Sequence, residues 1–252
     1  MENFVTDAIN IKTYPLSEND KIVLMFSRDN GLIRGVAKGV KKPKSKLGAR
    51  MDILVANKLM LKKGRNLDTI CQAQALNTFS KIRSDFDKMA YSMYLGELIS
   101  IFCKENSNNE EIYDYFYSTL ENISNADDKT KILLSILKFQ LVFMKALGYG
   151  IELEHCLYCG CKIQDELIFS LHEGGVICSD CDKVIGRKIK IPTKIRDFLM
   201  EISNSDLNCE TKYDSLVNEK VCETCFNLLK QYIELQSNVK IKTLDVINKT
   251  AV

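Results

Sequence analysis

The chain has 252 residues, of which 46% are hydrophobic and 27% charged, ordinary values for a globular protein with a buried core. Its first residues lack the basic and apolar segments of a signal peptide, and its longest apolar stretch, 132–147, is too short and too charged to span a bilayer. We therefore expect a cytoplasmic protein, whose ten cysteines are better explained by metal binding than by disulfides.

The net charge of +2 is unevenly distributed. Residues 1–65 hold 14 Lys and Arg against 6 Asp and Glu, whereas the remaining residues hold 21 against 27. A local excess of this size attracts polyanions. Because the rest of the chain is acidic, we expect any nucleic-acid site to be confined to the N-terminal region.

The first 79 residues are typical of short β-strands joined by turns. Five runs mix β-branched, aromatic and polar residues, as half-buried strands do. Asn30-Gly31 predicts a hairpin between the second and third runs, and residues 63–66 predict a turn between the last two. Because no room remains for crossover helices, the pattern predicts a small antiparallel barrel. The expected strands cover 8–14, 22–27, 32–37, 52–61 and 67–76.

A cation-rich segment follows the third expected strand. Residues 36–50 read VAKGVKKPKSKLGAR and contain no acidic side chain. Gly39, Pro43 and Gly48 interrupt regular structure, which predicts a mobile loop between two barrel strands. Clustered cations attract phosphates whatever the base sequence, so the segment favours nucleic-acid binding over a merely solvated loop. The candidate contacts are Arg34, Lys38, Lys41, Lys42, Lys44, Lys46 and Arg50, and Lys62, Lys63 and Arg65 extend the same charged region.

From about residue 80 the hydrophobic spacing becomes helical. Ser84 with Asp87 offers a cap for the first helix, and Gly148 offers a stop for the third. Each expected helix has an apolar face, so we expect the helices to pack on one another. They cover about 84–102, 109–123, 128–147, 193–202 and 215–236.

Two Cys-x-x-Cys pairs separated by 18 residues form the most specific motif in the chain. This spacing is typical of tetrahedral zinc. A strand at 167–171 and a glycine turn at 174–175 predict a zinc ribbon in which the second pair folds back onto the first. Four thiolates leave no open position for a reactive water, so we expect one structural Zn²⁺; buried cysteines without a metal, or a redox pair, are the alternatives. The candidate ligands are Cys156, Cys159, Cys178 and Cys181.

The remaining cysteines and both histidines have simpler interpretations. His155 and His172 lie near the motif but are expected to be bystanders, and Cys161, which could replace Cys159 as a ligand, breaks the ligand spacing. Cys222 and Cys225 fall within a helical pattern, where they are most simply core residues, with metal binding as the alternative. No role is expected for Cys71, Cys103 and Cys209.

Several short sequence segments occur in a specific order along essentially the whole chain. They are YPLSEND at 14–20, FSRDNG at 26–31, VAKG at 36–39 with its basic continuation, the ribbon with Phe169 and Gly174-Gly175, and KTL at 242–244. In this order the chain resembles the RecO family of bacterial DNA repair and recombination mediators. The third Cys-x-x-Cys, at 222–225, is not part of that resemblance.

The resemblance implies an α+β protein with three parts. These are an N-terminal OB-fold β-barrel at 1–79, a helical domain at 80–153 and 187–252, and an inserted four-cysteine zinc finger at 154–186. It also implies binding to single- and double-stranded DNA, with Arg34, Lys38 and the following lysines at the OB-fold contacts. Annealing of complementary strands is implied as well, as is cooperation with RecR and with the C-terminal tail of single-stranded DNA-binding protein to load RecA.

We therefore expect a DNA-binding accessory protein of the bacterial cytoplasm and nucleoid. The sequence has no Gly-rich phosphate loop and no Ser/His/Asp set, and it holds only two histidines, which argues against an enzyme. We expect neither a membrane partner nor a small-molecule substrate. The alternative is a zinc-ribbon protein that binds RNA or acts in transcription.

Overall fold

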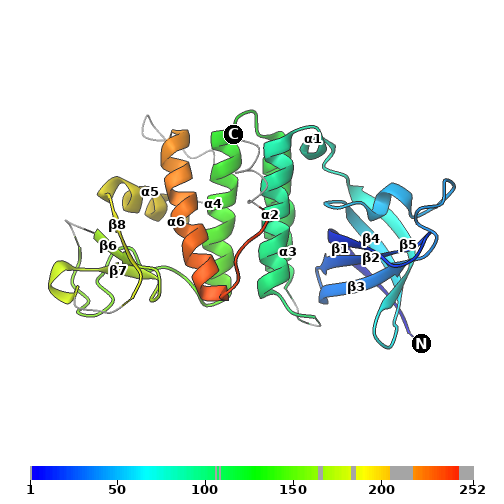
Figure 1. Cartoon of the computed structure of the whole chain (residues 1–252), viewed down its shortest axis with the longest axis horizontal. Coiled ribbons are helices and arrows are strands. Elements are labelled where there is room, and N and C mark those ends of the chain that lie inside the picture. Colours follow the sequence, from blue (N-terminus) through cyan, green and yellow to red (C-terminus); the bar gives the residue numbers. More distant parts are fainter. Residues whose placement is uncertain are drawn as a thin grey trace. The chain divides into compact units, whose positions relative to one another are not determined.

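The computed structural model describes residues 2–105, 107, 109–163, 167–182, 186–204 and 218–243 (Figure 1). The chain forms two compact units, one of Met1–Asn125 with Ile241–Val252 and the other of Ala126–Lys240. Cys209, residues 215–217 at the start of the last expected helix, and Leu244 lie outside the described residues.

Five strands close into a barrel, as the sequence predicts, in the order β1-β2-β3-β5-β4 and back to β1. All neighbours are antiparallel except β3 and β5, which pair in parallel, so the prediction of a wholly antiparallel barrel is wrong at this pairing. This is the strand order of an OB fold. The strands are β1 (Asn3–Pro15), β2 (Lys21–Ser27), β3 (Gly31–Ala37), β4 (Ala56–Lys62) and β5 (Asp68–Asn77).

The fourth strand begins at Ala56, later than the expected residue 52. A 3₁₀ helix, η1 (Gly48–Met51), precedes it instead. The buried side-chain amide of Asn10 explains the difference, because it donates to the carbonyl oxygens of Arg50 and Asp52, both at 2.8 Å. These bonds hold residues 50–52 to the side chain of Asn10, so the regular pairing of β4 begins only at Ala56.

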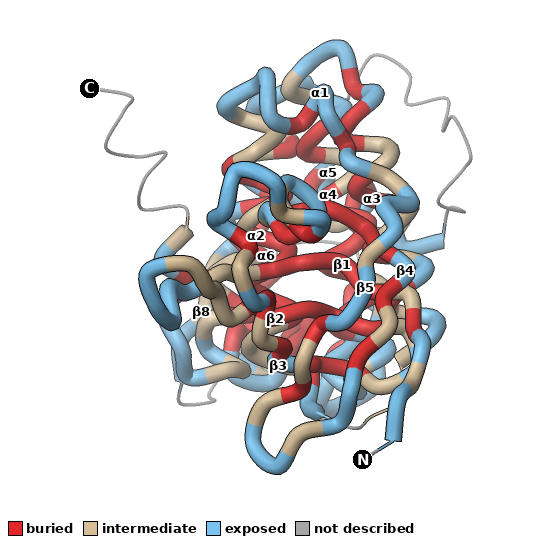
Figure 2. The backbone as a smooth tube through the Cα atoms, turned by 90° about the vertical axis from the view of Figure 1, so that its right-hand side faces the viewer, coloured by how far each residue is buried: buried red, intermediate tan, exposed pale blue. Residues whose placement is uncertain are grey.

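Alternate side chains of the strands fill the barrel. Figure 2 shows buried residues along β1, β2, β3 and β4, while much of the connecting chain is exposed. The core cluster consists of Ala8, Val23, Met25, Ile33, Ala37, Val40, Leu47, Met51, Leu59, Leu61 and Ile70. Val40 and Leu47 belong to the cation-rich segment, so that segment contributes to the core.

Among its described residues the first unit also has the α-helices α1 (Ser80–Arg83), α2 (Phe86–Phe102) and α3 (Glu110–Asn125). The cap of α2 is Asp85, whose side chain accepts from the N–H of Lys88, so the predicted cap at Ser84 is wrong by one residue. Ser84 has helical dihedrals as the C-cap of α1, whereas an N-cap needs an extended backbone.

In the second unit, the described residues form three α-helices and a small antiparallel sheet of order β7-β6-β8. Asp128 caps the first helix by accepting from the N–H of Lys131. Gly148 follows this helix at φ +84°, which confirms the predicted glycine stop. The elements are α4 (Lys129–Ala146), β6 (Leu167–Ser170), β7 (Gly175–Ile177), η2 (Ser179–Cys181), β8 (Lys188–Ile191), α5 (Thr193–Asn204) and α6 (Glu219–Ser237).

None of the helices among the described residues combines the length and the hydropathy needed to cross a bilayer.

Candidate nucleic-acid interface and metal cluster

The seven candidate DNA contacts are all exposed. Arg34 projects from β3, and the others follow β3 up to η1. Among the described residues, Arg34 alone of these seven has a carboxylate within 4.0 Å, that of Glu105. The other six positive charges are not neutralised by an ion pair in the part of the chain that the structure describes. They are Lys38, Lys41, Lys42, Lys44, Lys46 and Arg50.

The cation-rich segment is held more firmly than a mobile loop would be. Two of its apolar residues, Val40 and Leu47, are buried to 6% and 8% exposure in the barrel core. The N–H of Gly39 donates to the Asp20 carboxylate at 2.7 Å, and the N–H of Lys41 donates to Asn19 at 3.1 Å. The lysines between the anchors therefore project from a folded backbone.

Asp20, on the turn between β1 and β2, supports the candidate site, and sequence reasoning missed it. The N–H of Gly39 and the hydroxyl of Ser17 lower the pKa of its carboxyl group, and the nearby charges of Lys38 and Lys42 act in the same direction. Asp20 thus stays ionised and fixes the start of the cationic segment. No local motif signals this role, because the two partners are 19 residues apart.

The four predicted metal ligands come together at one end of the small sheet. The Sγ atoms of Cys156, Cys159, Cys178 and Cys181 all lie within 4.8 Å of one another, and those of Cys159 and Cys178 are 3.7 Å apart. Tetrahedral zinc with bonds of about 2.3 Å to sulfur places its ligands about 3.8 Å apart. The spacing of the thiols therefore fits such an ion.

The electrostatics of the cluster also fit a cation. Burial raises the pKa of Cys156, but N–H groups of Cys159, Cys178 and Tyr158 outweigh it and lower that pKa to about 6. The thiol of Cys181, beside that of Cys178, has its pKa raised to about 12. Thiols this close cannot all ionise, since each thiolate repels the next. A bound divalent ion would remove this conflict.

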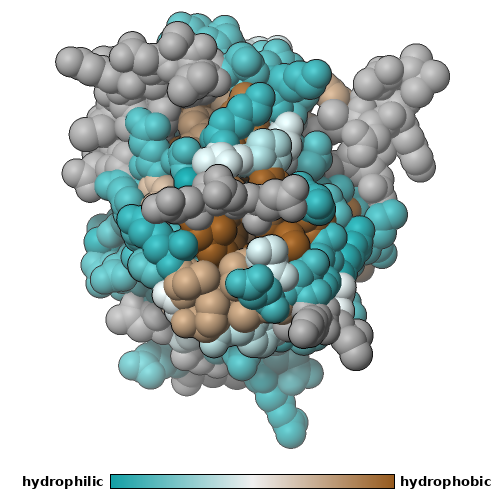
Figure 3. Space-filling view, turned by 90° about the vertical axis from the view of Figure 1, so that its left-hand side faces the viewer, coloured by the Kyte–Doolittle hydropathy of each residue, from teal (hydrophilic) through white to brown (hydrophobic). Residues whose placement is uncertain are grey.

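Local structure supports the cluster on both sides. The N–H of Cys178 points at the Cys156 sulfur at 3.4 Å, and the N–H of Cys156 donates to Cys161 at 2.8 Å. Cys161 lies outside the four-cysteine group, although its sulfur is 3.3 Å from that of Cys159. Figure 3 shows the side of Figure 1 on which β6, β7 and β8 lie, and some hydrophobic side chains reach the surface there among hydrophilic ones.

The two histidines near the motif and the third Cys-x-x-Cys pair lie outside the four-cysteine group, as the sequence predicts. Neither His155 nor His172 belongs to the four-cysteine group; each faces a neighbouring glutamate, at 3.9 and 3.7 Å. Cys222 and Cys225 are fully buried in α6. Burial raises their pKa values to about 11 and about 12, as expected of core thiols.

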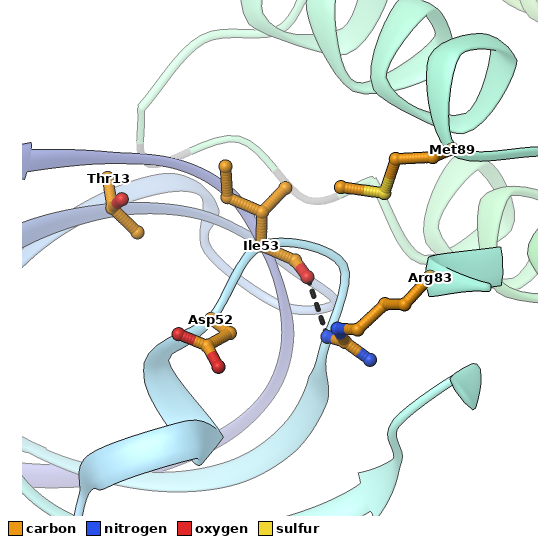
Figure 4. A pocket seen from close by; sticks show the side chains of 5 residues that line it. All are labelled: Thr13, Asp52, Ile53, Arg83 and Met89. Atoms are coloured by element: carbon orange, nitrogen blue, oxygen red, sulfur yellow. Dashed lines mark hydrogen bonds between the residues drawn. The ribbon is translucent and has the colours of Figure 1, made fainter. Parts of the chain in front are cut away.

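A separate cavity of about 290 Å³ lies between the barrel and the start of the first unit's helices. Figure 4 shows Arg83 reaching toward the chain at Ile53, where its guanidinium donates to the carbonyl oxygen at 2.9 Å. Thr13, Asp52 and Met89 complete the lining. Since the guanidinium also donates to the carbonyl of Thr78, Arg83 serves as a link between the barrel and α1.

A closed OB-type barrel joined to helices and a four-thiol cluster is a layout typical of nucleic-acid-binding proteins. A family model described as "Recombination protein O N terminal" matches residues 1–79, and one described as "Recombination protein O C terminal" matches 83–245. The chain belongs to the RecO family of DNA repair proteins.

Curated relatives named DNA repair protein RecO support this. The protein of Clostridium novyi (strain NT) is 29% identical over 246 residues, which are 97% of this chain and 93% of the relative. That of Dehalococcoides mccartyi (strain CBDB1) is 32% identical over 213 residues, 83% of each chain. That of Oceanobacillus iheyensis is 34% identical over 202 residues, 80% of this chain and 76% of the relative.

Proposed function

We propose that this protein binds single- and double-stranded DNA through the cations of the barrel and anneals complementary strands. The lysines neutralise phosphates of two strands, which lowers the repulsion between the strands and lets their bases pair. The contacts are electrostatic and independent of base sequence. The residues proposed to make them are Arg34, Lys38, Lys41, Lys42, Lys44, Lys46 and Arg50.

One observation carries the proposal. Six of the seven cations lack an ion-pair partner among the described residues, yet the backbone beneath them is anchored by Val40, Leu47 and Asp20. A fixed array of unneutralised charges binds a polyanion with less loss of conformational freedom than a flexible loop. Membership of a DNA repair family makes DNA the expected polyanion.

The metal proposed for the four-cysteine cluster is one Zn²⁺. The ligands would be Cys156, Cys159, Cys178 and Cys181, and the ion would supply a cross-link that holds the ribbon together. Four thiolates complete a tetrahedral shell, so the proposed role is structural.

The proposed partners follow from the family. They are RecR and the C-terminal tail of single-stranded DNA-binding protein, with which the protein would load RecA onto coated strands in the bacterial cytoplasm and nucleoid. The proposal needs no turnover of a small molecule and no membrane, so the protein would act as a mediator and not as an enzyme.

A strand-annealing assay tests the proposal. Bare complementary oligonucleotides, and the same strands coated with single-stranded DNA-binding protein, should both anneal faster with the protein, without nucleotide hydrolysis. RNA strands of equal length and sequence provide the comparison with an RNA-binding module. Failure to bind DNA even at low salt, or a clear preference for RNA, would overturn the proposal.

A further inference from the structure

The closure of the barrel brings a second group of cations next to Arg34. Strands β3 and β5 pair in parallel from Gly35 and Asp68 onward. The chain that enters β5 therefore runs beside β3, and the loop between β4 and β5 comes next to Arg34. Side chains of Arg34, Lys63 and Arg65 line one groove of about 180 Å³.

The loop between β4 and β5 is fixed by its backbone. The N–H of Lys63 donates to Glu2 at 3.0 Å, and that of Gly64 donates to the Asp68 carboxylate at 2.9 Å. A Cβ on Gly64 would lie 1.9 Å from the carbonyl oxygen of Leu67, so glycine is required for this tight turn. The loop therefore presents its cations from a defined backbone.

Two carboxylates reach the groove, and they have different roles. Asp68 is 9% exposed at its side chain and supports the loop through Gly64 and through Lys63, 3.6 Å away. Glu105 is 56% exposed and reaches the groove from the segment after α2, with its Oε1 3.5 Å from Nε of Arg34. Asp68 is thus part of the fold, whereas the Glu105 side chain rests on the surface.

The position of Glu105 is set by its backbone and not by its side chain. Glu105 forms isolated β-bridges with Gly31 and Leu32, and the N–H of Leu32 donates to the carbonyl of Lys104 at 3.1 Å. These contacts hold a carboxylate over Arg34. Because both side chains are more than half exposed and one contact joins them, the pair is weak and readily exchanged.

We propose that the groove bounded by Arg34, Lys63 and Arg65 is a subsite for one phosphodiester group of a bound strand, and that Glu105 occupies its Arg34 side until that phosphate displaces it. Carboxylate and phosphate oxygens compete for the same guanidinium donors. Glu105 therefore holds the affinity of the DNA site below the value that its cations alone would give. This inference rests on the proposed DNA-binding function.

The first test replaces the acid and keeps its shape. Glu105→Gln should tighten binding of a single-stranded oligonucleotide about two- to fivefold at 50 mM salt, the range expected for an exposed ion pair. Glu111→Gln is the matched control, since it removes the same charge from an exposed position at the start of α3. An equal gain in DNA affinity in both variants would show that only the net charge matters, and it would overturn the inference.

A double-mutant cycle tests whether the gain passes through Arg34. In an Arg34→Ala background, Glu105→Gln should change the affinity no more than Glu111→Gln does. Lys63→Ala and Arg65→Ala should each weaken binding, and the two together should reduce the salt slope by about 0.7, the value for one phosphate contact on a single strand. An undiminished gain without Arg34, or unchanged salt slopes, would contradict the subsite.

Failure of this inference is distinguishable from failure of the proposed function. If the lysines after β3 matter for DNA binding but Glu105→Gln has no effect, only the competing role of Glu105 is lost. If neither set of variants changes DNA binding, the DNA site itself is wrongly placed. Equal thermal unfolding midpoints for the Glu105 and Glu111 variants would show that folding does not account for the difference.

Discussion

The carboxylate of Glu97 in α2 accepts two hydrogen bonds from Thr243, one from its backbone N–H at 2.9 Å and one from its hydroxyl at 2.5 Å. Glu97 is 8% exposed, and the neighbouring Ile241 is fully buried. Residues 241–243 are thereby fastened to a helix some 145 residues earlier in the chain.

Removing this carboxylate should loosen the end of the described chain. Glu97→Ala is expected to lower the free energy of unfolding by about 2–3 kcal/mol, because hydrogen bonds to a charged group are lost. Thr243→Val, which removes only the hydroxyl, should cost about 1 kcal/mol. Urea unfolding measures both, and wild-type stability in Glu97→Ala would refute the fastening role.

Changing Lys41, Lys42, Lys44 and Lys46 to Ala should flatten the salt dependence of DNA binding. With about six phosphate contacts, single-strand affinity should fall roughly 10²–10³-fold between 50 and 200 mM salt, and with two contacts only about sevenfold. Fluorescence anisotropy at several salt concentrations measures the slope. The matched control changes exposed lysines of the second unit, Lys131, Lys145, Lys194 and Lys220, and a similar slope change there would argue against a localised site.

Cys156→Ser should abolish metal binding and unfold the ribbon while the barrel stays folded. Structural zinc contributes roughly 10–16 kcal/mol in model peptides, far more than this small sheet supplies. Cys161→Ser is the control, because Cys161 lies outside the four-cysteine group. Metal analysis should find one zinc per chain in the wild type and in the control. The same content in Cys156→Ser would defeat the ligand assignment.

Asp20→Ala should destabilise the protein at neutral pH and have less effect in acid. The pKa of Asp20 is lowered below its ordinary 3.8, so its contribution is present above that value and is lost as the pH falls through the lower, folded-state pKa. The gap between wild-type and variant melting temperatures should therefore narrow below pH 3.8. Asp20→Asn keeps an acceptor for the N–H of Gly39 and should therefore lose less stability than Asp20→Ala. A difference in melting temperature between wild type and Asp20→Ala that does not change with pH would exclude the charged contact.

A fragment of residues 1–79 should fold poorly, although the N-terminal family model ends there. The fully buried ring of Phe26 lies 6.2 Å from that of Tyr113 and 6.5 Å from that of Phe116. Without α3 this ring meets water. A fragment of 1–125 carrying Glu97→Gln, which avoids an unpartnered buried charge, should fold cooperatively. Circular dichroism and gel filtration compare them, and a monomeric, cooperatively unfolding 1–79 would contradict this.

The sequence predicts the elements well where the signal is local. Runs that mix β-branched, aromatic and polar residues mark the five strands, Gly148 marks the end of α4, and the cysteine spacing marks the ribbon. The domain boundary at residue 79 remains a prediction, and the packing of Phe26 on α3 shows why composition alone is a poor guide to it. Side chains distant in sequence decide which elements pack together.

The site is less visible in the sequence than the fold. The cations of residues 36–50 stand out by composition, but nothing nearby marks Asp20 as the residue that fixes their backbone. Glu105 also has no motif, since it reaches Arg34 only through tertiary bridges to the first two residues of β3. The burial of Val40 and Leu47 could not be predicted, because single apolar residues among lysines carry no periodic pattern.

The parallel seam between β3 and β5 has a consequence for how the barrel opens. It is registered over two residue pairs, whereas each other pairing in the barrel is registered over seven. Thermal fluctuations should therefore separate β3 from β5 before any other pair of strands in the barrel. Amide hydrogens beside this seam should exchange with deuterium ahead of those in β1 and β2. A nucleic-acid strand that bridges the seam would slow this exchange, which makes its rate a direct reporter of occupancy.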